Sequence, residues 1–274
     1  MDGLLRAALG ALDGAAGCTQ IPNPAGLDRG TRTYRAGGWK IKTMPAPALR
    51  LHHEACVYQA RERQGLHRGT RHGHLDDGHP DAGRWLAVPW VPGPTLWEAF
   101  APARNAHGSS AARGGLLDAA LAAAAELRRW HRDAWLHGDV QPANIVVAGR
   151  AAMFIDLEYA RHPRLRLPYP YRGGIAETTA PEVARQLVDS QQHAAELHPE
   201  AEVYALGAAI RWAWTGHPPA GRRDPGDAGP GRLLHAIAHG PPRALREDRP
   251  YPFPELEDLI EQALHPDPHR RALP

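Results

Sequence analysis

The segment Leu136-His-Gly-Asp-Val-Gln-Pro-Ala-Asn144 places a carboxylate, Asp139, five residues before an amide, Asn144. A second carboxylate follows at Asp156. One carboxylate in such a group can accept a proton, while the amide and the other carboxylate can hold Mg²⁺. We therefore expect these three side chains to form a site if the fold brings them together.

The residues between Asn144 and Asp156 predict how they come together. Two short apolar runs, Ile145–Ala148 and Ala152–Ile155, are separated by Gly149. Apolar runs of this length joined by a glycine turn are typical of a tight β-hairpin. Asp139, Asn144 and Asp156 would then meet at its base.

Composition narrows the class of protein. The chain has 274 residues, with 32 Lys and Arg against 30 Asp and Glu, so its formal net charge of +2 predicts neither a nucleic-acid-binding stripe nor a charged tail. Its two cysteines, Cys18 and Cys56, show no metal-binding or redox spacing, which favours reduced thiols in a cytoplasmic protein. No apolar run approaches the roughly 20 residues that a membrane span needs, and Leu4–Leu12 lacks the basic start of a signal peptide.

The first third of the chain predicts a small sheet. Residues 31–36 alternate, Gly37-Gly38 forms a turn and residues 39–43 resume the alternation, which predicts a β-hairpin. In the second strand, Trp39 and Ile41 share one face, and Lys40 and Lys42 share the other. Judged by pattern alone, these lysines are surface residues of a solvated strand.

A helix, a polar region and a buried strand follow. Leu49–Arg63 reads as a helix with Glu54 at its middle, and Leu66–Gly83 reads as a polar, His-rich loop region. Arg84–Val91 is continuous and apolar, as in a strand buried on both faces. We place the boundary of two lobes between Pro92 and Gly93, which gives an N-terminal lobe of residues 1–92 and a C-terminal lobe of residues 93–274.

The second lobe is predicted to be mostly helical. Leu116–Ala134 carries the clearest apolar stripe of the chain. Residues 105–115 and Arg161–Gly174 read as loops, the latter as an exposed one. Further helices are predicted to begin at Pro181 and to span Glu200–Trp214, Leu233–Ala238 and Leu256–Leu264. Strands with one helix, followed almost only by helices, predict an α+β fold with a small sheet-based lobe and a larger helical lobe.

Five motifs in this order resemble the protein-kinase-like family, from Trp39 to Arg271. The spacing of His137, Asp139 and Asn144 matches the family's catalytic loop, and Asp156 matches the metal-binding Asp that opens its Asp-Phe-Gly, although Leu157-Glu158 replaces Phe-Gly. The other three motifs are Ala180-Pro-Glu182, Glu202-Val-Tyr-Ala-Leu-Gly207 and the final Leu264 to Arg271. The resemblance implies the bilobal protein-kinase-like fold, with a β-rich N-lobe and a helical C-lobe, and an ion pair between Arg271 and Glu182.

The resemblance also implies roles in the N-lobe. Lys42 would bind the α- and β-phosphates of ATP, held in place by Glu54. The strand ending at Val91 becomes the hinge, with Val88 as gatekeeper, and the Pro89 carbonyl and Val91 N–H would meet adenine.

In the C-lobe, the resemblance implies that Asn144 and Asp156 hold Mg²⁺ and that Asp139 accepts the proton of the acceptor hydroxyl.

Several departures from the family pattern qualify these roles. Pro22–Gly30 lacks the glycine-rich spacing that covers phosphates in the family, so the phosphate cover is unassigned. Gly138 replaces the Arg that reads a phosphate on the activation loop, which argues against control by loop phosphorylation, and is common in small-molecule phosphotransferases. Gln141 replaces a lysine that contacts the γ-phosphate, and Ile175 replaces a threonine, which weakens the expected link to Asp139.

Three functions stay open on the sequence. The first is a bacterial Ser/Thr-kinase-like phosphotransferase that acts on a peptide or protein, favoured by the complete Ala-Pro-Glu, with a biosynthetic enzyme as a possible partner. The second is a small-molecule kinase of the aminoglycoside type, favoured by His137-Gly-Asp139. The third is a pseudokinase that binds a partner without catalysis, favoured by the absent glycine loop and Gln141.

Overall fold

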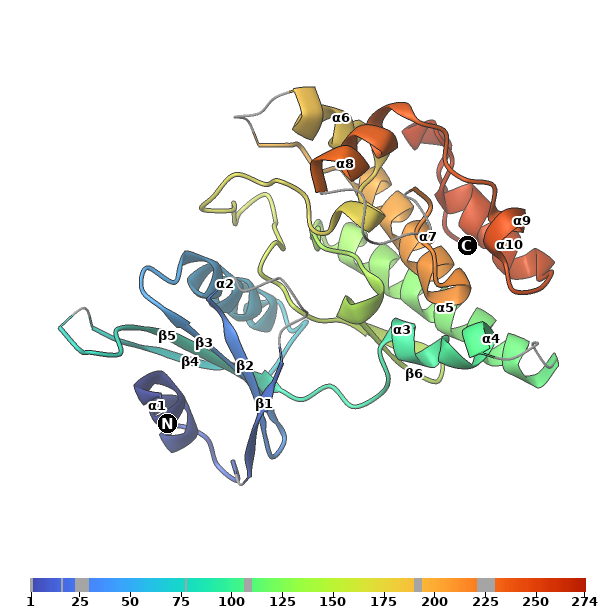
Figure 1. Cartoon of the computed structure of the whole chain (residues 1–274). Helices are drawn as coiled ribbons and strands as arrows, with labels where there is room; N and C mark the ends of the chain where they lie inside the picture. The colour runs from blue at the N-terminus through green and yellow to red at the C-terminus, as the bar shows by residue number, and fades with distance from the viewer. Residues whose placement is uncertain are drawn as a thin grey trace. The chain divides into compact units, whose positions relative to one another are not determined.

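A five-stranded antiparallel sheet is the centre of the first of two units into which the chain divides, Met1–Val91 and Pro92–Pro274 (Figure 1). The computed structural model describes residues 2–15, 17–22, 30–76, 78–105, 110–189, 194–220 and 230–274. The strands run in the order β1-β2-β3-β5-β4. They are β1 (Cys18–Ile21), β2 (Arg32–Ala36), β3 (Trp39–Pro45), β4 (Arg71–Leu75) and β5 (Gly83–Pro89), and the helices of this unit are α1 (Gly3–Gly10) and α2 (Leu49–Arg63).

The two faces of this sheet carry different helices. Ile41 of β3 lies in an apolar cluster with Leu4 and Ala8 of α1, whereas Lys42, the next residue along β3, bonds Glu54 of α2. Successive side chains of a strand point to opposite faces, so the predicted alternation of β3 is confirmed. The predicted hairpin is confirmed too, because Ala36 pairs with Trp39 across Gly37-Gly38.

One prediction for this unit is wrong. The His-rich region contains strand β4, which pairs with β5 along its whole length, from Arg71 opposite Ala87 to Leu75 opposite Gly83. Three of the five residues of β4, Arg71, His72 and His74, are polar and exposed, as is common for a strand at the edge of a sheet. Its apolar periodicity is therefore too weak to reveal it.

Helices dominate the second unit, so the predicted α+β class is confirmed. The helices are α3 (Leu96–Ala99), α4 (Ala101–Asn105), α5 (Ser110–Arg132), α6 (Pro181–Asp189), α7 (Pro199–Thr215), α8 (Pro230–His239), α9 (Leu245–Asp248) and α10 (Pro254–Ala263). The described residues of this unit also form one hairpin and three 3₁₀ turns: β6 (Ile145–Ala148) with β7 (Ala151–Phe154), and η1 (Pro142–Asn144), η2 (Ala176–Thr178) and η3 (Pro268–Arg270).

Helix α7 is the buried centre of this unit, and α5 and α10 pack against it. Most of its buried residues are apolar, including the fully buried Leu206, Ile210 and Trp214. Pro199 begins the helix, where a missing N–H costs nothing, and Gly216 ends it with φ of 80°. In the part of the chain that the structure describes, no helix combines the length and the apolar character needed to cross a bilayer.

Helix α5 is longer than predicted. It begins at Ser110 rather than Leu116 and includes Gly114 and Gly115, which had favoured a loop. Glycine costs a helix only about 1 kcal/mol relative to alanine, an amount that the packing of a long helix can offset. Residues 106–109 of the predicted loop lie outside the described residues.

Candidate active site

The hairpin that follows Asn144 has the predicted form. Ile145 pairs with Phe154, Gly149 turns with φ of 61°, and the Ile155 N–H donates to the Asn144 carbonyl at 2.9 Å. Asn144 and Asp156 therefore flank the open end of the hairpin. Asp156 itself has φ of 63°, which is uncommon for a residue other than glycine and often occurs at functional sites.

Three donors surround the Asp139 carboxylate. The side-chain amides of Gln141 and Asn144 donate to Oδ2 at 2.8 and 2.9 Å, and the Ile175 N–H donates to Oδ1 at 3.2 Å. Asn144 also donates to the Asp139 carbonyl at 3.0 Å. The carboxylate is thus held in one orientation by residues on both sides of the hairpin.

The contact from Ile175 changes one expectation. Replacement of threonine by Ile175 was expected to weaken the link to Asp139, yet the link is present because the main chain makes it. Gln141 lacks the charge of a lysine, and its amide bonds Asp139 instead.

His137 holds the Asp139 loop through hydrogen bonds of both ring nitrogens. Its Nδ1 accepts the Asp139 N–H at 3.2 Å, so Nε2 must carry the hydrogen that faces the Ile155 carbonyl at 3.0 Å. The ring is fully buried against Trp130 and Phe154. His137 therefore ties the Asp139 loop to the strand that precedes Asp156.

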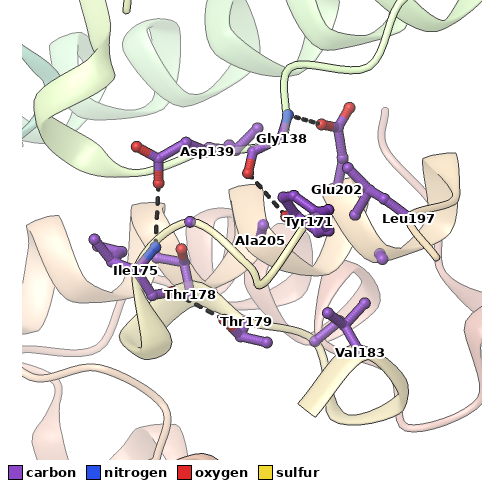
Figure 2. Close-up of a pocket in the computed structure, with 14 residues that line it drawn as sticks. Gly138, Asp139, Tyr171, Ile175, Thr178, Thr179, Val183, Leu197, Glu202 and Ala205 are labelled. Atoms are coloured by element: carbon purple, nitrogen blue, oxygen red, sulfur yellow. Dashed lines mark hydrogen bonds between the residues drawn. The ribbon is translucent and has the colours of Figure 1, made fainter. Parts of the chain in front are cut away.

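Gly138 is held from two directions, as Figure 2 shows. Its N–H donates to Glu202 Oε1 at 2.7 Å, and its carbonyl accepts the Tyr171 hydroxyl at 2.8 Å. Its φ is 79°, and a Cβ there would lie 2.5 Å from the Tyr159 carbonyl oxygen. Glycine is thus required at this position by the backbone itself.

Glu202 joins three segments. It lies in the first turn of α7 and is almost fully buried, and its Oε2 contacts His131 Nε2 of α5 at 2.8 Å. Its other oxygen bonds Gly138. Neither Glu202 nor Tyr171 was predicted as part of the site, because both act over long sequence separations.

A cavity of about 20 Å³ lies between the Asp139 loop and the segment that leads to α6 (Figure 2). Its walls include Asp139, Tyr171, Thr178 and Glu202. A space of this size holds one water molecule, so no substrate can enter it. It marks a closely packed junction rather than a binding pocket.

The first unit contains a second group of charges. Lys42 Nζ bonds both oxygens of Glu54, at 2.9 and 2.8 Å, and the two residues are 7% and 2% exposed. The sequence alone suggested surface positions for both, and only the family resemblance predicted the pair. Removal of either partner would leave the other charge buried without this contact, so the position of each side chain depends on the other.

Other predicted nucleotide contacts lie at the end of the first unit. Pro89 is the last residue of β5 and pairs with Trp39, and Val88 is buried. The Trp90 N–H donates to Gly38, whereas the Val91 N–H donates to no backbone group of the described residues. The assignment of Pro89 and Val91 to adenine stays a prediction. Residues 23–29 of the segment considered for a phosphate cover lie outside the described residues.

The predicted ion pair at the C-terminal end is present. Arg271 bonds both oxygens of Glu182, with Nη1 at 2.7 Å and Nη2 at 2.8 Å. Arg271 also donates to the carbonyls of His265 and Glu200, each at 2.9 Å. The start of α6, which follows the Asp139 contacts along the chain, is thereby fixed to the end of the chain.

Comparison with known proteins gives a distant likeness. No family model matches the chain. Over 209 residues, 75% of the chain, it is 26% identical to the probable serine/threonine-protein kinase PkwA of Thermomonospora curvata, and over 143 residues, 52% of the chain, it is 29% identical to mitogen-activated protein kinase kinase kinase 8 of Rattus norvegicus. These matches cover 25% and 28% of the two proteins, so the chain spans about a quarter of the length of each. The chain is therefore distantly similar to serine/threonine protein kinases.

Proposed function

We propose that this chain is an ATP- and Mg²⁺-dependent phosphotransferase that moves the γ-phosphoryl group to a Ser or Thr hydroxyl of a peptide or protein. The observation that carries the proposal is the fixed Asp139 carboxylate, bonded by Gln141, Asn144 and the Ile175 N–H at the base of the hairpin that ends at Asp156. Phosphoryl transfer depends on positioning and charge neutralisation more than on covalent help from the protein. An oriented carboxylate beside potential metal ligands supplies both.

Asp139 is the proposed base. It orients the acceptor hydroxyl and accepts its proton as the bond to phosphorus forms. Gln141 donates to one oxygen and the Ile175 N–H donates to the other, which fixes the orientation of the carboxylate. Lys42, positioned by Glu54, is the proposed partner of the α- and β-phosphates.

The donor set at the hairpin fits Mg²⁺. The side-chain nitrogen of Asn144 donates to two oxygens of Asp139, so the side-chain oxygen of Asn144, its Oδ1, points away from Asp139. This Asn144 oxygen makes no hydrogen bond to any described residue. An amide oxygen and the Asp156 carboxylate are hard oxygen ligands of the kind that Mg²⁺ prefers. When bound, Mg²⁺ would neutralise charge on the phosphates.

The acceptor class is proposed from two observations. Both relatives named above are protein kinases by name, and PkwA is named a probable serine/threonine-protein kinase. The Ala180-Pro181-Glu182 motif is complete, and its Glu182 is paired with Arg271. A peptide or protein acceptor is therefore favoured over a small molecule.

The nucleotide part of the proposal is tested by calorimetry with Mg·ATP. Lys42→Ala removes a charge-assisted contact to phosphate, so we expect about 10- to 100-fold weaker binding. Arg71→Ala is the matched control, because Arg71 is an exposed cation of the edge strand β4 that shares the face of Ile41 and not that of Lys42, and it should bind ATP as the wild type does. Circular dichroism checks that Lys42→Ala, which takes the Lys42 ammonium away from Glu54, is folded. Equal ATP affinity of folded Lys42→Ala and wild type would remove Lys42 from the site.

A panel of acceptors separates the possible activities. Wild-type protein is incubated with Mg·ATP and either a Ser/Thr peptide library or a set of aminoglycosides and other small alcohols. Phosphorylated peptide supports the proposal, and phosphorylated small molecule replaces it with a small-molecule kinase. ATP binding without transfer to either class would indicate a pseudokinase.

A further inference from the structure

The segment between Arg161 and Ile175 is attached to the Asp139 loop by one buried side chain, Tyr171. Tyr171 is 6% exposed, and its hydroxyl donates to the carbonyl of Gly138, the residue before Asp139. Its own carbonyl accepts the Ala195 N–H at 2.8 Å. The sequence predicted an exposed loop here, and Tyr171 shows that this prediction is wrong at its centre.

Arg161 covers the ring of Tyr171. The guanidinium carbon lies 4.1 Å from the ring centroid, within the range of a cation–π contact. Two of its nitrogens, Nε and Nη2, are buried and have no hydrogen-bond partner among the described residues. Burial lowers the pKa of Arg161, and the nearby Tyr171 and Glu202 oppose this shift. The ring of Tyr171 is thus a main contact of the Arg161 guanidinium, two of whose nitrogens have no hydrogen-bond partner among the described residues.

The anchor at Tyr171 and the contact at Asp139 belong to the same short stretch. Tyr171 bonds the Gly138 carbonyl, and Ile175, four residues later, bonds the Asp139 carboxylate (Figure 2). The Gly138 peptide is held from its other side by Glu202. Displacement of Tyr171 would therefore remove one of the two contacts described for the Gly138 peptide and would loosen the stretch that carries the Ile175 donor to the Asp139 carboxylate.

The same segment offers no free hydroxyl for a regulatory phosphate. Residues 161–175 contain no Ser or Thr. Their two tyrosines are both engaged, Tyr169 with the Glu158 carbonyl and Tyr171 with Gly138. The following Thr178 and Thr179 are buried, and Thr179 donates to the Ile175 carbonyl at 2.9 Å.

We infer that Tyr171, with Arg161 stacked on it, is a positioning residue for Asp139 that keeps this segment in its active arrangement without phosphorylation. The inference rests on the proposed function, because it takes Asp139 as the base. Burial raises the pKa of the Tyr171 phenol well above its usual value, so the hydroxyl stays a donor throughout the working pH range.

The test is Tyr171→Phe in the full chain, which keeps the ring under Arg161 and removes only the hydroxyl. Loss of one neutral hydrogen bond predicts a kcat about 3- to 10-fold lower, with the KM for Mg·ATP unchanged. The matched control is Tyr251→Phe, which removes a buried hydroxyl without a hydrogen-bond partner among the described residues and should leave kcat unchanged. Wild-type kcat in Tyr171→Phe would overturn the inference.

Two further readouts separate this inference from the proposed function. Hydrogen exchange of the peptide containing Ile175 needs no activity, and we expect faster exchange in Tyr171→Phe than in wild type or Tyr251→Phe. Equal exchange would overturn the anchoring role even if the wild type has no kinase activity. If the wild type is active, phosphatase treatment should leave its rate unchanged, and loss of activity would overturn independence from phosphate.

Discussion

At the scale of single residues, Gly138 is a departure from the kinase pattern that the backbone geometry explains. From the sequence alone, the glycine indicated only that the Arg side chain that binds a loop phosphate in the kinase family is missing. The structure adds a physical requirement, because φ is 79° and the Tyr159 carbonyl occupies the space that a Cβ would need. Any other residue here must distort the peptide before Asp139.

Gly138→Ala should therefore lower the free energy of unfolding by about 1–3 kcal/mol, the usual cost of a strained backbone conformation. Gly115→Ala is the control, because Gly115 lies in α5 with open space around its Cβ, and it should stabilise by about 0.5–1 kcal/mol. Urea unfolding followed by circular dichroism measures both. Equal stability of Gly138→Ala and wild type would show that the backbone there adapts without cost.

The sequence predicted some site residues and missed others for a physical reason. Asp139 and Asn144 are five residues apart, and their contact follows from a local turn that the pattern reveals. Glu202 is 64 residues from Gly138, and Tyr171 is 33 residues from it, and these contacts depend on how helices and loops pack. These two contacts could be predicted only from a resemblance to a known family, because no local sequence pattern reveals which distant residues pack together.

At the scale of elements, local patterns identified most helices and both hairpins. Leu49–Arg63 has the predicted bounds of α2, and β6 with β7 forms the predicted hairpin. The failures include β4, which is a strand because it pairs with β5 and not because of its own pattern, and the first turns of α5, where tertiary packing outweighs two glycines. The short helices α4 and α9 were not predicted either.

The ion pair between α6 and the chain end allows a test at this scale. Glu182→Gln leaves the guanidinium of Arg271, whose side chain is 0% exposed, without its carboxylate. Breaking a buried pair costs about 3–5 kcal/mol, and we expect the lower end because Glu182 is 25% exposed. Asp118→Asn, in an exposed pair with Arg150, should change the free energy of unfolding by less than about 1 kcal/mol. Chemical denaturation of the two variants compares them, and similar small effects would contradict a structural role for the Glu182 pair.

At the scale of the whole molecule, two chemically distinct groups are built into two units. The first unit has a buried Lys42–Glu54 pair on its sheet, and the second has Asp139, Asn144 and Asp156 around a hairpin. The first pair is buried, and the Asp139 carboxylate of the second group is half-buried and held by donors from several residues; groups of this kind cluster at functional sites. Together with the distant likeness to kinases, they favour catalysis over a purely binding role.

The central claim is that Asp139 is the base of a phosphoryl transfer. The most direct measurement compares wild type and Asp139→Asn for transfer of the γ-phosphoryl group from Mg·ATP to the best peptide acceptor, with ATP affinity measured on the same samples. Asn keeps the size of the side chain but cannot accept the proton, so we predict a rate about 10²- to 10⁴-fold lower with ATP affinity nearly unchanged. Transfer by Asp139→Asn at the wild-type rate would contradict the account.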